Sequence, residues 1–320
     1  MTSEISRRSA LAMIGGTAAA ASVPFAALAQ EKPLVRVSII PIFAVAPHFV
    51  AEKEGYFAAE GISVTTQPVQ TGSVGIPALL SGAFDVLYSS TVPILIAMER
   101  GIDLRIIAES TRVPSTPPDG VALFKRKGEP LATGKDLEGK SVAINAKFGF
   151  QWLAVSKWVK KTGGDYTKIE FREIPFPSMM DALKSKQVDA AFMLDPFKMS
   201  AFEDPALELL SWATSVGMPG VSTSVWVVSG KTADERPDLI RKYQRGFMKG
   251  GQWVNDNFGK PPYLEVVAGF TKMDPAKLAQ SATEPQVMQI DPAAIDGIGE
   301  IMQEFDLLKQ KANVGPKIFK

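Results

Sequence analysis

The chain alternates short runs of β-branched and other apolar residues with longer segments whose apolar residues recur at helical spacing. In the first part, the short runs predict strands at 35–40, 63–69, 85–89 and 104–109. The helical periods between them predict helices at 47–60, 71–80 and 93–100. Strands and helices that alternate through short loops predict an α/β fold with doubly wound, mainly parallel sheets.

Two segments rich in proline and glycine interrupt this alternation. Val113–Gly120 contains three prolines and a glycine, and Gly217–Gly220 has the sequence Gly-Met-Pro-Gly. Segments of this composition predict stiff connectors. Between them, strands are predicted at 121–124, 141–145, 169–174 and 189–194, with helices at 150–161 and 178–186. A strand at 224–228 and several helices follow the second connector.

This order predicts a second lobe inserted into a first lobe that is built from both parts of the flanking chain. We expect lobe one to comprise residues 30–113 and 222–320, and lobe two residues 120–217. The hinges are then expected near 114–119 and 218–221.

Charge and composition exclude several classes of protein. The chain has 35 Lys and Arg against 34 Asp and Glu, so its net charge is +1, which argues against nucleic-acid binding. It has no Cys and a single His, His48, which excludes thiol nucleophiles, iron–sulfur clusters and His- or Cys-based metal sites. We therefore predict a protein that is not an enzyme and that holds no cofactor or metal.

The first 29 residues have the pattern of a signal peptide. Arg7 and Arg8 precede an apolar stretch over 10–21, and Ala27-Leu28-Ala29 is an A-x-A cleavage site. The arginine pair fits twin-arginine export, although Sec signals also contain such pairs. Without a Cys for a lipid anchor, and without a later apolar run long enough to span a membrane, the mature protein is predicted to be free in the periplasm.

Four motifs in order resemble the periplasmic substrate-binding proteins of ABC importers, in the group for nitrate, sulfonates, taurine and thiamine precursors. They are Ala46–Phe57, Leu80–Val86, Asp136–Ala143, and Val188–Phe192 with Asp195-Pro196-Phe197 after it. The resemblance extends from about Leu34 to about Asn257. It implies a two-lobed type II periplasmic-binding-protein fold, like a Venus flytrap, with two hinge crossings. It also implies a monomeric solute receptor that delivers its ligand to an inner-membrane ABC permease with a cytoplasmic ATPase.

Candidate ligand-binding residues follow predicted strands, because α/β folds bind ligands at the carboxyl ends of their strands. Hydroxyl groups and a helix N-terminus lie there in lobe one, and a Lys-Phe-Gly-Phe segment and a carboxylate in lobe two. In each case a helix cap or a core position is the alternative role. The candidates are Phe43, Thr71, Gly72, Ser73, Ser89, Ser90, Thr91, Lys147, Phe148, Gly149, Phe150, Asp195 and Phe197.

These residues leave two ligand classes open. Hydroxyls, helix N-termini and Lys147 favour an organic anion such as a carboxylate or sulfonate, with the phenylalanines around an apolar body. Asp195 favours the alternative, a heterocyclic vitamin precursor such as a pyrimidine. His48 is interpreted as a packed or capping residue, and Arg112 either as an anion contact across the hinge or as part of a surface salt bridge.

One further pattern suggests a different activity. Gly134–Ser141 matches G-x-x-x-x-G-K-[ST], the phosphate loop of nucleotide enzymes. That loop should lead into a helix, whereas 141–145 is predicted as a strand, so the match argues only weakly for an ATPase. A single His without a G-x-S-x-G motif also disfavours a serine hydrolase. A ligand sensor for a membrane receptor remains an alternative to a transport receptor.

Overall fold

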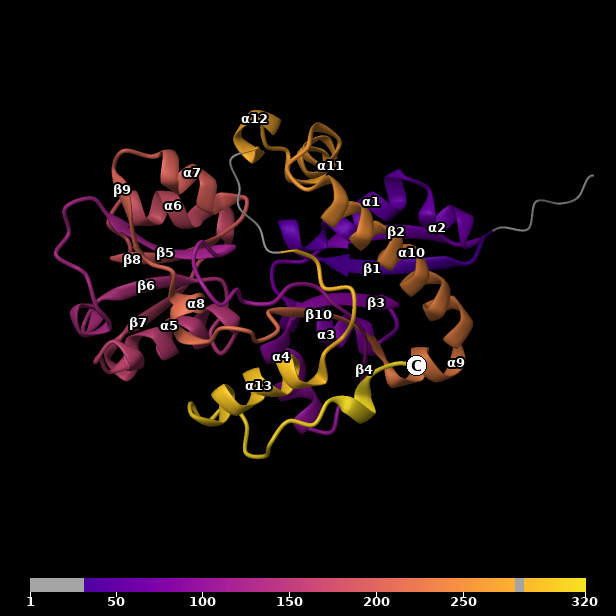
Figure 1. Cartoon of the computed structure of the whole chain (residues 1–320). Helices are drawn as coiled ribbons and strands as arrows, with labels where there is room; N and C mark the ends of the chain where they lie inside the picture. The colour runs from indigo at the N-terminus through magenta and orange to yellow at the C-terminus, as the bar shows by residue number, and fades with distance from the viewer. Residues whose placement is uncertain (1–31, 280–284) are drawn as a thin grey trace, which may run out of the picture. The chain divides into compact units, whose positions relative to one another are not determined.

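Two five-stranded sheets form the framework of the computed structural model, which describes residues 32–279 and 285–320 (Figure 1). The predicted signal peptide lies outside the described residues. The first sheet has the order β2-β1-β3-β10-β4 and the second the order β7-β6-β8-β5-β9. The strands are β1 (Leu34–Ile39), β2 (Ser63–Pro68), β3 (Val86–Ser90), β4 (Leu104–Glu109), β5 (Val121–Arg126), β6 (Ser141–Ile144), β7 (Glu170–Glu173), β8 (Ala190–Leu194), β9 (Leu207–Ser211) and β10 (Ser224–Ser229).

Both sheets are mixed in the same way. In the first, β1 pairs in parallel with β2 and β3, while β10 runs antiparallel to β3 and β4. In the second, β6 pairs in parallel with β7 and β8, while β5 runs antiparallel to β8 and β9. Four strands of each sheet therefore point one way and one runs against them, in agreement with the predicted α/β class of mainly parallel sheets.

Helices cover both faces of each sheet. On the first sheet, α1 and α10 lie on one face and α3, α4 and α13 on the other; on the second, α6 and α7 lie opposite α5 and α8 (Figure 1). The helices are α1 (Ala46–Lys53), α2 (Tyr56–Ala59), α3 (Gly72–Leu80), α4 (Thr91–Glu99), α5 (Phe150–Lys161), α6 (Phe176–Lys184), α7 (Phe197–Glu203), α8 (Ala213–Gly217), α9 (Gly230–Glu235), α10 (Pro237–Asn257), α11 (Pro261–Thr271), α12 (Pro275–Leu278) and α13 (Pro292–Gln303).

Strand β10 shows why helices must pack against both faces of the first sheet. Val225 and Val227 belong to the hydrophobic core on one face of the sheet, and Trp226 and Val228 to the core on the other face. All four side chains are fully buried. A strand buried on both faces is a continuous apolar run rather than an alternating one, which is the pattern that predicted it.

The structure corrects the sequence prediction at two places. The single helix predicted over 47–60 is two helices, because Gly55 between α1 and α2 adopts the left-handed conformation with φ of 73°. Strand β9 and helix α8 were not predicted at all. Leu207–Ser211 has half-buried residues along most of its length, so it lacks the strong apolar run that marked the other strands.

The chain passes between the two sheets twice, and the two segments are hydrogen-bonded to each other. The Thr223 N–H donates to the Thr111 carbonyl oxygen at 3.0 Å, and the Val113 N–H donates to the Val221 carbonyl oxygen at 2.9 Å. Arg112 and Ser222 form an antiparallel bridge between them. The paired segments adjoin the predicted hinges, whose motion remains a prediction.

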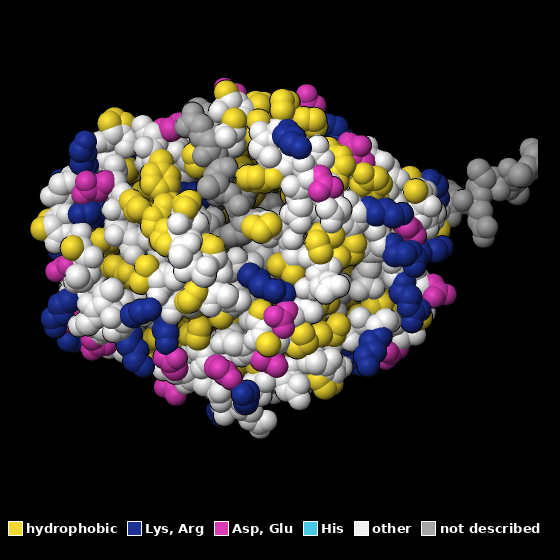
Figure 2. All heavy atoms as spheres, in the orientation of Figure 1, with side chains coloured by type: hydrophobic (Ala, Val, Ile, Leu, Met, Phe, Trp, Pro, Cys, Tyr) yellow, Lys and Arg dark blue, Asp and Glu magenta, His cyan; other side chains and the backbone are white. Residues whose placement is uncertain are grey.

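Within the described ranges, each helix is too short or too polar to cross a bilayer. Figure 2 shows Lys and Arg side chains interspersed with Asp and Glu over the visible face, without a large area of one sign. This distribution agrees with the near-zero net charge of the whole chain.

Candidate functional site

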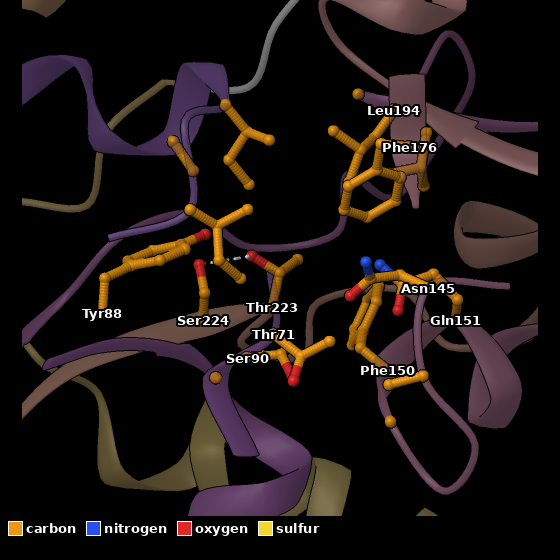
Figure 3. A pocket seen from close by; sticks show the side chains of 18 of the residues that line it. Thr71, Tyr88, Ser90, Asn145, Phe150, Gln151, Phe176, Leu194, Thr223 and Ser224 are labelled. Atoms are coloured by element: carbon orange, nitrogen blue, oxygen red, sulfur yellow. Dashed lines mark hydrogen bonds between the residues drawn. The ribbon is translucent and has the colours of Figure 1, made fainter. Parts of the chain in front are cut away.

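A cavity of about 970 Å³, counting its open mouth, lies between the carboxyl edges of the two sheets (Figure 3). In Figure 3, Tyr88, Ser90 and Ser224, on strands of the first sheet, face Phe150, Gln151 and Phe176, on helices that follow strands of the second. Both lobes therefore contribute to one site.

Strand ends and helix starts supply most of the lining. Thr71 caps α3, with its Oγ1 accepting a hydrogen bond from the Val74 N–H at 3.4 Å. Ser90 ends β3 immediately before α4, and Gly149 precedes α5. The first N–H groups of a helix have no partner within that helix, but the Thr91 N–H at the start of α4 donates to the Thr223 carbonyl oxygen. The starts of α3 and α5 are therefore the positions that can offer donors to the cavity.

The antiparallel strands bring a second set of polar groups to the same edge. Ser224, at the start of β10, lies opposite Ser90 at the end of β3. The Thr223 hydroxyl lies 2.6 Å from the Thr111 hydroxyl and 3.2 Å from the Ser224 hydroxyl. Thr111 and Thr223 belong to the two segments that cross between the sheets, so these segments form part of the cavity wall.

Aromatic rings and amides from lobe two form the opposite wall. Phe150 and Phe176 begin α5 and α6, and both are buried. Gln151 lies on the first turn of α5, and Asn145 follows β6 with its Nδ2 donating to the Gln70 carbonyl oxygen at 3.3 Å. The wall thus combines flat apolar surfaces with groups that both donate and accept hydrogen bonds.

Two carboxylates lie at the cavity, and each has internal partners. The Asp119 carboxylate accepts hydrogen bonds from the Val121 and Ser215 N–H groups, both at 2.9 Å, and from the Thr214 hydroxyl. Asp195 forms an ion pair with Lys198, whose Nζ also donates to the Asp119 carbonyl oxygen at 2.6 Å. Among the described residues that line the cavity, the cationic side chain is Lys147, which is exposed at the rim. The site therefore carries no excess of positive charge.

The structure brings most of the predicted candidates to this cavity. Ser89, Thr91 and Phe197 do not line it, because Ser89 donates to the Ser90 carbonyl oxygen, Thr91 donates to the Ser222 carbonyl oxygen, and Phe197 stacks on the outer side of Phe176. Whether the lining residues bind ligand remains a prediction. The predicted candidates that line the cavity are Phe43, Thr71, Gly72, Ser73, Ser90, Lys147, Phe148, Gly149, Phe150 and Asp195.

Several of these residues also have structural roles. Gly72 has no room for a side chain, since a Cβ there would lie 2.0 Å from the Ser89 Oγ. Phe43 packs edge-on against Tyr263, with ring centroids 6.4 Å apart. Phe148 is 55% exposed and has φ of 57°, an unusual conformation for a residue with a side chain. Phe148 therefore stands at the cavity mouth rather than inside it.

His48 and Arg112 both lie off the cavity. His48 is buried, with Nδ1 3.0 Å from the Tyr243 hydroxyl and Nε2 2.8 Å from the Thr66 hydroxyl, and burial lowers its pKa to about 3. Arg112 binds both oxygens of Glu109, at 2.8 and 2.9 Å, and this pairing raises the pKa of the guanidinium. His48 is thus a packed residue, as interpreted, and Arg112 is engaged in a salt bridge.

The Gly134–Ser141 segment does not have phosphate-loop geometry. A short 3₁₀ turn over Gly134–Leu137 is capped by Thr133 and Asp136, and Ser141 then begins strand β6 rather than a helix. The Asp136 carboxylate accepts hydrogen bonds from Thr133, which lower its pKa. The segment is a structural turn before an inner strand.

Several cavity residues were missed by sequence reasoning. Thr223 and Ser224 precede a strand instead of following one, so the rule of strand carboxyl ends did not select them. Asp119, Gly120 and Val121 share this arrangement at the start of β5. The antiparallel direction of β5 and β10 would have indicated them, but pairing direction has no local signal in the sequence. The others missed include Tyr88, Thr111, Asn145, Gln151 and Phe176.

Two similar lobes with a cavity between their sheets define the periplasmic-binding-protein fold, and solved structures support this class. The chain is similar to the alkanesulfonate-binding protein SsuA from Xanthomonas axonopodis pv. citri bound to MOPS, with a TM-score of 0.74 and 18% identity. The match covers 90% of this chain and 98% of that one. At this identity, the likeness shows the fold alone.

Residues 42–257 match the model of the NMT1/THI5-like family, and the chain belongs to that family. Its relatives include the riboflavin-binding protein RibY of Chloroflexus aurantiacus, 25% identical over 72% of this chain, and a formylaminopyrimidine-binding protein of Halalkalibacterium halodurans, 22% identical over 65%. The alignments span 64% and 62% of those two proteins, less than two thirds of their length. RibY, the formylaminopyrimidine-binding protein and SsuA are all named as binding proteins.

Proposed function

We propose that this protein is an exported solute receptor that binds an uncharged, flat heterocycle between its two lobes and delivers it to an ABC permease. The charged groups around the cavity are the reason for proposing an uncharged ligand. Asp119 and Asp195 lie at the site, while the cation Lys147 is at the exposed rim and Lys198 is paired with Asp195. A buried anion would face the Asp119 carboxylate, whose repulsion is strongest where water is excluded, and the charge of Lys198 is already balanced by Asp195.

The remaining lining suits a heterocycle with carbonyl and N–H groups on its edge. The amides of Asn145 and Gln151 and the hydroxyls of Tyr88, Ser90 and Ser224 can each donate and accept hydrogen bonds. The rings of Phe150 and Phe176 offer surfaces on which a flat ligand can stack. Two family relatives named for riboflavin and formylaminopyrimidine support this ligand class.

A second candidate is an organic anion, the class that the sequence favoured first. The helix starts at Gly72 and Phe150 direct N–H groups to the cavity, and Lys147 stands at its mouth. These groups would stabilise a carboxylate or sulfonate. The same N–H groups can also donate to a neutral carbonyl oxygen, and the Asp119 carboxylate disfavours an anion, so the heterocycle is the first candidate.

A thermal-shift panel separates the two candidates. The panel contains riboflavin, lumichrome, uracil, cytosine and aminopyrimidines on one side, and alkanesulfonates, taurine and aromatic acids on the other. A compound at about 100 times its Kd stabilises the folded protein by about 2.7 kcal/mol. We expect the melting temperature to rise with a member of the first set. A rise with sulfonates or carboxylates alone would establish the anion receptor instead.

A further inference from the structure

A second, apolar groove adjoins the cavity. Nine apolar residues and two amides line it, and it contains about 750 Å³ of space, counting its open mouth. Pro68 and Val69 come from the end of β2, and Pro175, Pro177 and Phe197 come from the starts of α6 and α7. Among the described residues around the groove, none carries a charge. Both lobes thus present apolar surface to the same space.

The groove adjoins the cavity, because the two spaces share part of their lining. Ile40, Ile42, Asn145 and Phe176 line both, so they form the boundary between them. The Phe176 ring is stacked on Phe197 on the groove side, with centroids 6.1 Å apart and planes 13° apart. At this boundary, the Asn145 amide donates to the Gln70 carbonyl oxygen of the other lobe at 3.3 Å, which is a long hydrogen bond.

The chemistry changes sharply across this boundary. On the cavity side lie the hydroxyls of Thr71, Ser90, Thr223 and Ser224, whereas the groove side offers prolines, Val69 and Phe197. A molecule that occupies both spaces must be polar at one end and apolar at the other. Because the groove is open to solvent, the apolar end of such a molecule can vary in length without a change in the contacts of its polar end.

We propose that the groove binds an apolar arm of the same ligand, whose polar ring lies in the cavity. The inference rests on the proposed function for the ring, and it narrows the substrate class to heterocycles that carry an alkyl or aryl substituent. Contact with Val69 from one lobe and with Phe197 from the other makes the arm a second bridge between the lobes. Arm length then determines affinity, while the ring determines specificity.

Two matched ligand series test this proposal by calorimetry on the full protein. One series is N1-methyl-, N1-butyl- and N1-hexyluracil; the other is methane-, butane- and hexanesulfonate. Transfer of each buried methylene from water predicts a gain of about fourfold in affinity. The variant Val69→Trp fills the groove. Leu80→Trp is the control, because Leu80 is an exposed apolar residue at the other end of α3 from the cavity.

We expect affinity for the uracils to rise more than about tenfold from methyl to hexyl in the wild type and in Leu80→Trp. The rise should disappear in Val69→Trp. A rise that survives in Val69→Trp, or methyl and hexyl compounds that bind equally to the wild type, would overturn the groove assignment alone. A groove-dependent rise in the sulfonates alone would keep the groove and overturn the heterocycle. Failure of every member of both series to bind would overturn both.

Discussion

The Nζ of Lys198 lies 3.1 Å from a carboxylate oxygen of Asp195, and the two side chains are only 2% and 3% exposed. Lys198 also lies over the Trp212 ring, 5.4 Å from its centroid. Asp195 was predicted from the sequence as a ligand-binding carboxylate, or otherwise a helix cap. In the structure, Lys198 lies one helical turn further on and balances the charge of Asp195. The carboxylate therefore forms an ion pair in the interior of lobe two as well as lining the cavity.

Replacement of this lysine should be costly. In Lys198→Met, the Asp195 carboxylate stays buried without its counter-charge, which is expected to lower the free energy of unfolding by about 3–5 kcal/mol. Lys184→Met is the matched control, because Lys184 pairs with Asp204 at 2.6 Å but is 40% exposed. The control should cost less than about 1 kcal/mol. Urea unfolding of both variants measures the difference; equal costs would mean that Asp195 is not held by Lys198.

Substitution of two neighbouring serines should distinguish a residue that contacts ligand from one with a structural role. Ser90 lines the cavity, whereas Ser89 is fully buried and donates to the Ser90 carbonyl oxygen. Ser90→Ala should weaken binding of the compound selected by the thermal-shift panel by about 0.5–1.5 kcal/mol, which is the net value of one hydrogen bond. Ser89→Ala should lower stability by a similar amount and leave the Kd unchanged. Calorimetry would contradict the site if Ser89→Ala weakened binding more than Ser90→Ala.

His48 predicts a specific dependence of stability on pH. Its pKa in the folded protein is about 3, below the value of about 6.5 in an unfolded chain. Since the unfolded state therefore binds the proton first, stability is complete above about pH 6.5 and falls as the pH drops towards 3. At about pH 5 the loss should reach about 2 kcal/mol.

The variant His48→Gln isolates this contribution. Burial also raises the pKa of Glu52, but this effect is common to both proteins and cancels in their difference. We expect the stability of the wild type relative to His48→Gln to decrease by about 2 kcal/mol between about pH 7 and about pH 5. Denaturant unfolding across this range gives the result, and a constant difference would show that His48 is protonated in the folded state.

Much of the fold could be predicted because its local signals are strong. The helix Phe150–Lys161 and the strand Leu104–Glu109 have the predicted bounds, and Thr71 caps its helix as expected. Apolar periodicity and capping residues act over a few neighbouring positions, so they are visible in the sequence. Gly55 is the exception, since nothing nearby showed that its left-handed conformation would divide a helix rather than end one.

The cavity was predictable only in part, for a different reason. Ser90 ends a strand, Thr71 caps the helix after β2, and Phe150 begins the helix after β6, so the predicted order of strands and helices placed them at the carboxyl edge. Thr223 reaches that edge because β10 enters the first sheet antiparallel and far along the chain from β3. That insertion depends on tertiary pairing, which local patterns do not encode.

On the proposed function, one small molecule binds between the two sheets and contacts both lobes. Hydrogen exchange measured by mass spectrometry, with and without the compound selected by the thermal-shift panel, tests this binding mode most directly. We expect added protection at the starts of α3 and α4 and at Thr223–Ser224 in one lobe, together with protection over Asn145–Gln151 in the other. Protection confined to one lobe, or located away from these segments, would contradict it.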